Sequence, residues 1–258
     1  MLASETNYSE TTFLTPVLQQ NGGYAVRIFT PAREIAFAGH PILGTAWVVR
    51  RFVATGLPET LVLNLGVGQV RITFEVDSNG REIAYFVAPE TKLVPTCSRE
   101  NIASALRLDP ICIDMERPVQ QISAGVSALI VPARNLDALR RCTVGNEGFA
   151  ELARLGLPSL VYFYCQQTRD PRNDICARFF FEANGAREDP ATGNGAAFLG
   201  SYLLEHRIFP RSGFSLRVEQ GENLGRPSVI YLRARETDGQ REISVGGSVI
   251  LTVRGELA

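Results

Sequence analysis

The stretches Phe37-Ala38-Gly39-His40-Pro41 and Asp189-Pro190-Ala191-Thr192-Gly193-Asn194 repeat one pattern in the two halves of the chain. Each is a glycine turn that follows a strand-like run and opens an apolar run of helix length. The apolar runs, residues 42–49 and 195–204, mix small and large apolar residues and carry almost no charge. A helix of this composition has no polar face, so other elements have to enclose it. The repeat therefore predicts an internal duplication in which each half wraps a sheet around one central helix.

The start of each predicted helix is also a candidate anion site. A first helical turn leaves backbone N–H groups unpaired and carries the positive end of the helix dipole. If the halves pack face to face, one small carboxylate or phosphate would sit between two such turns. A glycine turn taken alone is equally consistent with an ordinary helix start. The presence of the same turn in both halves favours the interpretation as an anion-binding site.

The composition is that of a globular protein. The chain has 258 residues, 45% of them hydrophobic and 21% charged, which is enough for two domains of ordinary size. With 26 Lys and Arg against 27 Asp and Glu, the formal charge of -1 gives no positive field for nucleic acid or an anionic membrane. No apolar run reaches the roughly 18 residues of a spanning helix, and residues 1–6 lack the features of a signal peptide. We therefore expect a cytoplasmic protein without nucleic-acid or membrane partners.

The cysteines give no sign of a metal or a disulfide framework. They are five in number, scattered, and form no Cys-x-x-Cys pair, so small buried hydrophobes are the simpler interpretation. The chain also lacks a Gly-x-Gly-x-x-Gly fingerprint after a strand and a Gly-Lys-Ser/Thr loop. No metal and no cofactor are expected.

Hydrophobic periodicity predicts an α+β chain. In the first half, alternation and aromatic content predict strands at residues 11–14, 24–29, 59–65, 69–76 and 82–87. In the second half, strands are predicted at 128–132, 160–164, 178–181, 214–218, 228–235 and 242–253, and helices at 98–106, 135–141 and 148–155. The pattern lapses between Pro89 and Pro95. We therefore expect an N-terminal half over residues 1–92 and a C-terminal half over 93–258, with the option that the last strand returns to the first half.

Three motifs, in this order along the chain, resemble those of the PhzF family, the phenazine-biosynthesis isomerases and their relatives. Asn7-Tyr8-Ser9-Glu10-Thr11-Thr12-Phe13 resembles the catalytic-glutamate segment of the family, residues 29–41 its first glycine turn, and residues 188–193 its second. Weaker support comes from residues 220–221, 225–228 and 245–247. The resemblance implies a diaminopimelate-epimerase-like fold of two pseudo-repeated halves, each a mixed β-barrel around a central helix. It also implies a site in the cleft between the halves and, usually, a homodimer.

The chain departs from the related families at three places. In the related amino-acid epimerases two cysteines, one at each glycine turn, act as acid and base; Ala38 and Thr192 stand at those places here, so two-thiol racemisation is not expected. Asn194-Gly195 replaces a common Ser-Ala. PhzF proteins usually begin with a strand, a Gly-Asn-Pro turn and a helix before the glutamate segment. That start is missing here, so we expect an N-terminal barrel truncated at its start, with exposed sheet edges and uncertain activity.

Three charge-carrying residues are the candidates for catalysis. Partial burial of Glu10 would raise its carboxyl pKa toward working pH and suit it to moving a proton, although by pattern alone it is a surface acid. His40 lies on a glycine turn, where a helix N-terminus favours the neutral imidazole; helix capping is the alternative. Asp189 precedes a proline and a glycine turn, which also fits an N-cap or turn role. Because the two glycine turns repeat one pattern, we expect Asp189 at the second turn to act together with His40 at the first.

The resemblance implies a cofactor-independent isomerase that moves a proton on a small carboxylate. Glu10 would remove a proton from carbon and return it elsewhere, while His40 and Asp189 hold or protonate the substrate. The predicted substrate-binding residues are Ser9, Gly39, Gly193 and Asn194. In the named family member the reaction is isomerisation of trans-2,3-dihydro-3-hydroxyanthranilate. Two alternatives stay open: a non-catalytic binding or scaffold protein of the same fold, and a racemase that uses other groups.

Overall fold

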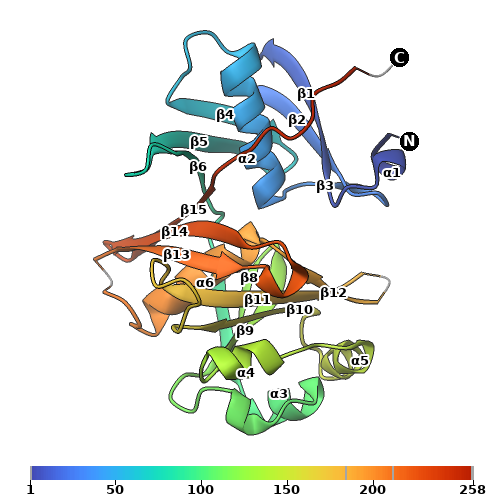
Figure 1. Ribbon diagram of the computed structural model, residues 1–258, viewed down its shortest axis with the longest axis vertical. Helices are drawn as coiled ribbons and strands as arrows, with labels where there is room; N and C mark the ends of the chain where they lie inside the picture. Colours follow the sequence, from blue (N-terminus) through green and yellow to red (C-terminus); the bar gives the residue numbers. More distant parts are fainter. Residues whose placement is uncertain (1, 184, 211, 257–258) are drawn as a thin grey trace. The chain divides into compact units, whose positions relative to one another are not determined.

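The computed structural model describes residues 2–183, 185–210 and 212–256 and contains two compact units (Figure 1). The first unit runs up to Val87 and includes the segment from Gly246 onward. The second unit is Ala88–Val245. A division into domains between residues 92 and 93 stays a prediction.

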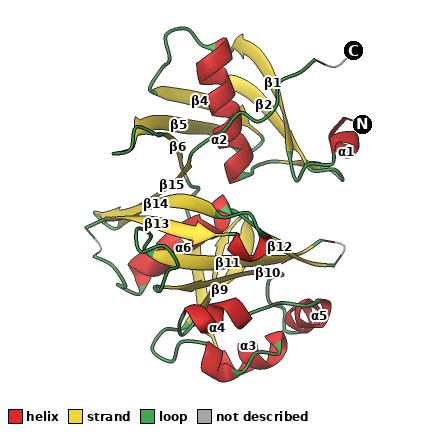
Figure 2. Ribbon diagram, in the orientation of Figure 1, coloured by secondary structure: helices red, strands yellow, loops and turns green. Residues whose placement is uncertain are grey.

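The first unit is a mixed sheet with one long helix packed on it (Figure 2). Its strands are β1 (Thr11–Leu18), β2 (Tyr24–Phe29), β3 (Glu34–Ile35), β4 (Thr60–Leu65), β5 (Gly68–Val76) and β6 (Glu82–Val87). The order across the sheet is β1-β2-β4-β5-β6, and β3 pairs with β2. Strands β2 and β4 run parallel, and the other neighbours run antiparallel. A short helix, α1 (Leu2–Thr6), precedes the sheet.

The long helix of this unit, α2 (Gly39–Val48), continues into one π-helical turn, η1 (Val49–Val53). It packs against β1, β4 and β6 and buries Ile42, Leu43 and Ala46. On its other side Val48 is 37% exposed, so the expectation that this helix is enclosed all round was wrong. The strands that contact α2 cover only part of its circumference.

The second unit is a larger mixed sheet with helices on both faces. Its strands are β7 (Lys92–Cys97), β8 (Val119–Ala124), β9 (Val126–Pro132), β10 (Leu160–Cys165), β11 (Ile175–Glu182), β12 (Ala186–Asp189), β13 (Phe214–Gln220), β14 (Ser228–Thr237) and β15 (Gln240–Gly247). Its helices are α3 (Arg99–Leu106), η2 (Pro110–Cys112), α4 (Leu136–Arg141), α5 (Asn146–Arg154), α6 (Gly193–Glu205) and η3 (Glu222–Leu224). The strand order is β15-β14-β13-β11-β10-β9-β8-β7, with β12 on β11. The pairs β9–β10 and β11–β13 are parallel.

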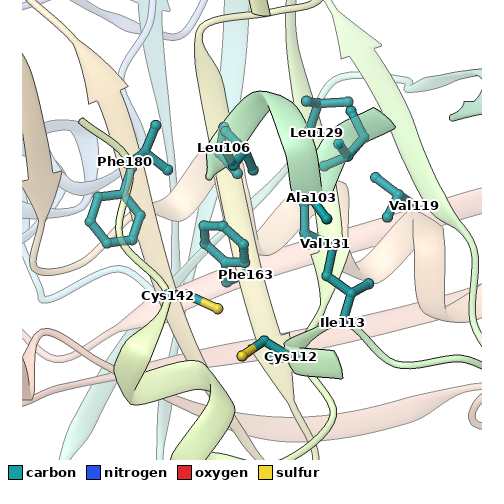
Figure 3. Packing of buried hydrophobic residues seen from close by; sticks show 14 of the residues in the cluster. Ala103, Leu106, Cys112, Ile113, Val119, Leu129, Val131, Cys142, Phe163 and Phe180 are labelled. Carbon is teal, nitrogen blue, oxygen red and sulfur yellow. The ribbon is translucent and has the colours of Figure 1, made fainter. Parts of the chain in front are cut away.

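Strand β10 shows why this sheet is covered on both faces. Successive side chains of a strand point to opposite faces. Val161 and Phe163 enter an apolar core built with α3, α4 and α5, which also contains Leu129 and Phe180 (Figure 3). Tyr164 instead packs edge to face on Tyr202 of α6. A strand that is buried on both faces has a continuous apolar sequence, because neither face meets solvent. Residues 160–164 have such a sequence.

Helix α6 is the enclosed helix that the sequence predicts. Residues 195–204 are all buried, and the helix packs against β8, β9 and β14. Helices α2 and α6 begin at Gly39 and Gly193, at the two glycine turns. The expected fold class, an α+β chain whose two halves each combine mixed β-structure with one central helix, is confirmed.

The structure differs from the sequence expectation at the C-terminal strand and at β7 and β8. The predicted strand over residues 242–253 ends at Gly247, and residues 248–256 are outside any strand. Their β-branched residues favour a strand, but they belong to no strand here and Ile250 is 80% exposed. Strands β7 and β8 were not predicted, because prolines and glutamines interrupt their apolar pattern.

Candidate active site

The side chains of Glu10 and His40 are in contact in the first unit. Glu10 directly precedes β1, and His40 is in the first turn of α2. An oxygen of the Glu10 carboxylate, Oε2, lies 3.0 Å from His40 Nε2. The glutamate side chain is 18% exposed and the histidine side chain 50% exposed. One group of the pair is therefore shielded while the other is open to a substrate.

The join between β1 and α2 positions this pair. Thr45 Oγ1, on the buried side of α2, donates its one hydrogen to the Pro41 carbonyl at 2.8 Å, and it lies 2.7 Å from Thr12 Oγ1, whose hydroxyl is then the donor. Thr12 is two residues after Glu10, and Pro41 follows His40. One buried hydroxyl thus fixes the strand start against the helix start. The Thr45 hydroxyl thus links the segment that carries Glu10 to the one that carries His40.

The environment of Glu10 lowers its carboxyl pKa. Burial acts to raise the pKa, but the hydrogen bond and charge of His40, together with a hydrogen bond from Ser9, outweigh it. The expectation that burial would raise this pKa toward working pH was therefore wrong. Glu10 is ionised at neutral pH and is present in the form that accepts a proton.

The N-terminus of α2 lies beside the pair and has no side-chain cap. The N-cap residue, Ala38, is extended and has no polar side-chain atom, and Gly39 behind it is buried. The first-turn N–H groups of a ten-residue helix therefore remain available to an anion. Ser9, the other predicted substrate-binding residue here, is exposed and hydrogen-bonds Glu10.

Asp189, Gly193 and Asn194 lie together in the second unit. Asp189 ends β12, and Gly193 and Asn194 begin α6. Thr192 Oγ1 donates to Asp189 Oδ2 at 2.5 Å, so this hydroxyl is not a helix cap. The structure thus brings Glu10 to His40 within one unit, and Asp189 to the start of α6 within the other. That both groups serve one substrate stays a prediction.

A buried ion pair that the sequence analysis missed supports the strand leading to Asp189. Arg178 Nε and Nη2 donate to the two Glu188 oxygens at 2.8 and 2.7 Å, and the two side chains are 7% and 11% exposed. Arg178 Nη1 also donates to the backbone carbonyls of Leu139, Arg140 and Cys142. The pair joins β11, β12 and the end of α4. The only sequence signal for it is opposite charge on two neighbouring strands, which is too common to be specific.

A cavity of about 290 Å³ lies in the second unit. It is lined by Arg169, Asp170, Glu219, Gln220 and Glu222 among others. Arg169 pairs with Glu222 at 3.0 Å and Asp170 with Arg172 at 2.6 Å, whereas Glu219 accepts hydrogen bonds from the backbone amides of Arg169 and Asp170.

None of the five cysteines belongs to either glycine turn in the sequence. Burial raises the pKa of Cys142 to about 12 and that of Cys165 to about 11, so neither is a thiolate at neutral pH. Within the described ranges, no group of three or more His, Cys, Asp and Glu side chains could hold a metal ion. Over the same residues, no helix is both long and apolar enough to span a bilayer.

The chain resembles known proteins over nearly its whole length. The family model for phenazine biosynthesis-like proteins matches residues 1–255. An uncharacterized isomerase of Mesorhizobium japonicum is 31% identical over 264 residues, which are 99% of this chain and 87% of that protein. Trans-2,3-dihydro-3-hydroxyanthranilate isomerase of Pseudomonas aeruginosa is 32% identical over 275 residues, with the same two coverages of 99% and 87%.

Solved structures give the same result. A PhzF-family phenazine biosynthesis protein of Bacillus anthracis superposes with a TM-score of 0.85 at 23% identity, covering 96% of this chain and 84% of that one. A predicted epimerase of Pseudomonas aeruginosa has a TM-score of 0.77 at 29% identity, covering 99% and 86%. The chain belongs to the PhzC-PhzF family of phenazine biosynthesis-like proteins.

Proposed function

We propose that this chain is a cofactor-independent isomerase that moves a proton on a small carboxylate substrate. The observation that carries the proposal is the shielded, ionised Glu10 at 3.0 Å from an exposed histidine at a helix N-terminus. A proton carrier has to be in its basic form before it meets the substrate, and Glu10 is. Relatives of this chain are named isomerases, which supports the reaction class.

In the proposed reaction Glu10 accepts a proton from a carbon atom of the substrate. The electron pair left on carbon spreads into an adjacent unsaturated or carboxylate group, and Glu10 returns the proton to a different carbon. His40 Nε2 stays beside the Glu10 oxygen and holds the substrate or transfers a second proton. Substrate binding would exclude water from this pair, which strengthens the effect of His40 on the carboxylate.

The developing negative charge needs stabilisation, and the N-terminus of α2 can supply it. Backbone N–H groups at an uncapped first turn, starting at Gly39, act as preorganised donors for an anion. Asp189 is proposed to hold or protonate the substrate, with Gly193 and Asn194 as binding residues. A homodimer and a cytoplasmic location belong to the same proposal.

The substrate class is taken from the relative that acts on trans-2,3-dihydro-3-hydroxyanthranilate. That compound is used as the probe, in buffer made with D₂O, and transfer of solvent deuterium to carbon is followed by NMR. Glu10→Gln keeps the shape of the side chain but removes the base, so exchange should fall by about 10²–10⁴-fold while binding by calorimetry persists. His40→Ala and Asp189→Ala should each reduce the rate within the same range.

Glu34→Gln is the matched control in the same unit. Glu34 is an exposed carboxylate paired with Arg27 at 2.6 Å, and its loss should leave exchange at the level of the unchanged protein. Undiminished exchange in Glu10→Gln would refute the assignment of the proton carrier. Binding of the probe without any exchange by the unchanged protein would favour the non-catalytic alternative.

A further inference from the structure

The buried amide of Gln220 holds the second glycine turn from inside the fold. Gln220 is the last residue of β13 and is 3% exposed. Its Nε2 donates to the Asp189 carbonyl at 2.7 Å and to Thr192 Oγ1 at 3.0 Å. Its Oε1 lies 3.3 Å from the Tyr162 hydroxyl and 3.5 Å from the Thr192 amide nitrogen. Both the nitrogen and the oxygen of the Gln220 amide therefore contact residues of the turn at 189–192.

These contacts fix the direction of the Thr192 hydroxyl. An amide nitrogen can only donate, so Thr192 Oγ1 accepts from Gln220. The single hydroxyl hydrogen is then left for Asp189 Oδ2, at 2.5 Å. The result is a relay in which Gln220 donates to Thr192 and Thr192 donates to the carboxylate. Without the Gln220 amide, the hydroxyl would be free to rotate toward another acceptor.

The backbone after Gln220 explains how this amide reaches the turn. Gly221 has φ +86°, a conformation that side chains other than glycine rarely adopt. A Cβ atom at Gly221 would lie 2.5 Å from the Pro190 carbonyl and would also collide with the Arg226 carbonyl. Glycine therefore lets the end of β13 approach the Asp189–Thr192 turn closely enough for direct hydrogen bonds.

We propose that Gln220 is a positioning residue that sets the orientation of the Asp189 carboxylate through Thr192. The inference rests on the proposed function, in which Asp189 contacts the substrate, and it concerns residues of one unit only. A group that orients a catalytic side chain should affect the rate of the chemical step more than the binding of substrate.

The first test compares two buried glutamines. In Gln220→Leu, kcat should fall by about 10–100-fold while KM changes by less than about 3-fold. Gln120→Leu is the matched control: Gln120 is 7% exposed, its Nε2 donates to the Val94 carbonyl, and its Oε1 contacts His206 at the other end of α6. It removes a buried amide of equal size in the same unit but should leave kcat within about 2-fold. Equal effects of the two substitutions on kcat would overturn the proposal.

The second test asks whether Gln220 acts through Thr192. In the Thr192→Val background the relay is already lost, so adding Gln220→Leu should change kcat by less than about 2-fold. Independent roles would instead give the full effect of Gln220→Leu in both backgrounds, which contradicts the relay. Gln220→Glu adds a pH test: a protonated carboxyl can donate as the amide does. Its rate relative to the unchanged protein should therefore recover as the pH falls, and a constant ratio counts against the relay.

A structural readout separates this inference from the proposed function. In a crystal structure of substrate-free Gln220→Leu, the distance from Thr192 Oγ1 to Asp189 Oδ2 should exceed 3.5 Å, beyond hydrogen bonding. In Gln120→Leu that contact should persist. A retained contact in Gln220→Leu would refute the relay even if the protein proves to be an isomerase. A lost contact together with an inactive unchanged protein would instead refute the proposed function and leave the orientation of Asp189 by Gln220 established.

Discussion

Removing Glu188 should destabilise the second unit strongly, because it would leave a buried guanidinium without its carboxylate. Arg178 and Glu188 form two hydrogen bonds of 2.8 and 2.7 Å, and both side chains are nearly inaccessible to solvent. Arg178 also lies over the Phe180 ring, 4.8 Å from its centroid. In Glu188→Ala the Arg178 guanidinium keeps its carbonyl acceptors at the end of α4 but loses the carboxylate that balances its charge.

The size of the effect follows from this arrangement. Breaking a buried ion pair by removing one partner costs about 3–5 kcal/mol. The retained carbonyl acceptors solvate part of the Arg178 charge, so we expect the lower end, about 3 kcal/mol. At about 2–4 °C per kcal/mol for a unit of this size, the Tm of Glu188→Ala should fall by about 6–12 °C.

Calorimetry or circular dichroism would measure this shift, and the chain offers a matched control. Arg154 and Glu151 form the same two-bond pair at 2.8 and 2.6 Å on the surface of α5, with side chains 69% and 37% exposed. Glu151→Ala should change the Tm by less than about 1 °C, because solvent screens an exposed pair. If Glu188→Ala shifts the Tm no more than Glu151→Ala does, the reasoning from burial is wrong.

Two further predictions concern stability. The pKa of Glu10 is lowered in the folded protein from an ordinary value of 4.5, so the ionised carboxylate stabilises the fold above that pH, and this contribution is lost as the pH falls through the folded value. The difference in unfolding free energy between the unchanged protein and Glu10→Gln, from urea titrations, should therefore shrink below about pH 4.5; a constant difference would contradict it. Gly195→Ala would place a Cβ atom 2.5 Å from the Tyr162 ring and should cost about 1–3 kcal/mol. Gly44→Ala meets open space within α2 and should stabilise by about 0.5–1 kcal/mol, and thermal unfolding would show opposite signs for the two.

The duplicated architecture could be predicted because two separate signals agree on it. A glycine turn followed by an uncharged apolar run marks both α2 and α6, and each helix begins at its turn. Alternating residues locate β2 and β5 almost to the residue. These elements depend on local sequence, so local patterns are sufficient for them.

The misses concern features that depend on partners distant in sequence. Residues 248–253 have strand-like composition, but a strand requires a neighbour with free backbone groups, which composition does not reveal. Strand β8 carries polar residues on a face that is nevertheless buried, since Gln120 bonds the Val94 carbonyl of β7. The uncovered side of α2 likewise depends on how many strands surround it.

The candidate site shows the same limit at the level of chemistry. The family motifs indicated Glu10 and His40 separately, and the structure places them 3.0 Å apart. The direction of the Glu10 pKa could not be predicted, because burial and an adjacent histidine act in opposite directions and the sequence shows neither distance. Gln220 was visible only as part of a weak motif, since its role depends on hydrogen bonds across 28 to 31 residues.

The two glycine turns are equivalent in backbone pattern but differ in chemistry, and the difference bears on the reaction class. A carboxylate beside a histidine flanks the first turn, whereas the carboxylate at the second accepts a hydrogen bond from the hydroxyl of Thr192. A histidine partner and a hydroxyl partner stabilise a carboxylate to different extents, so the two acids should not exchange roles freely. Racemisation uses an acid and a base that do exchange roles as the reaction reverses. The asymmetry therefore supports the proposal made above, in which one group, Glu10, both takes and returns the proton.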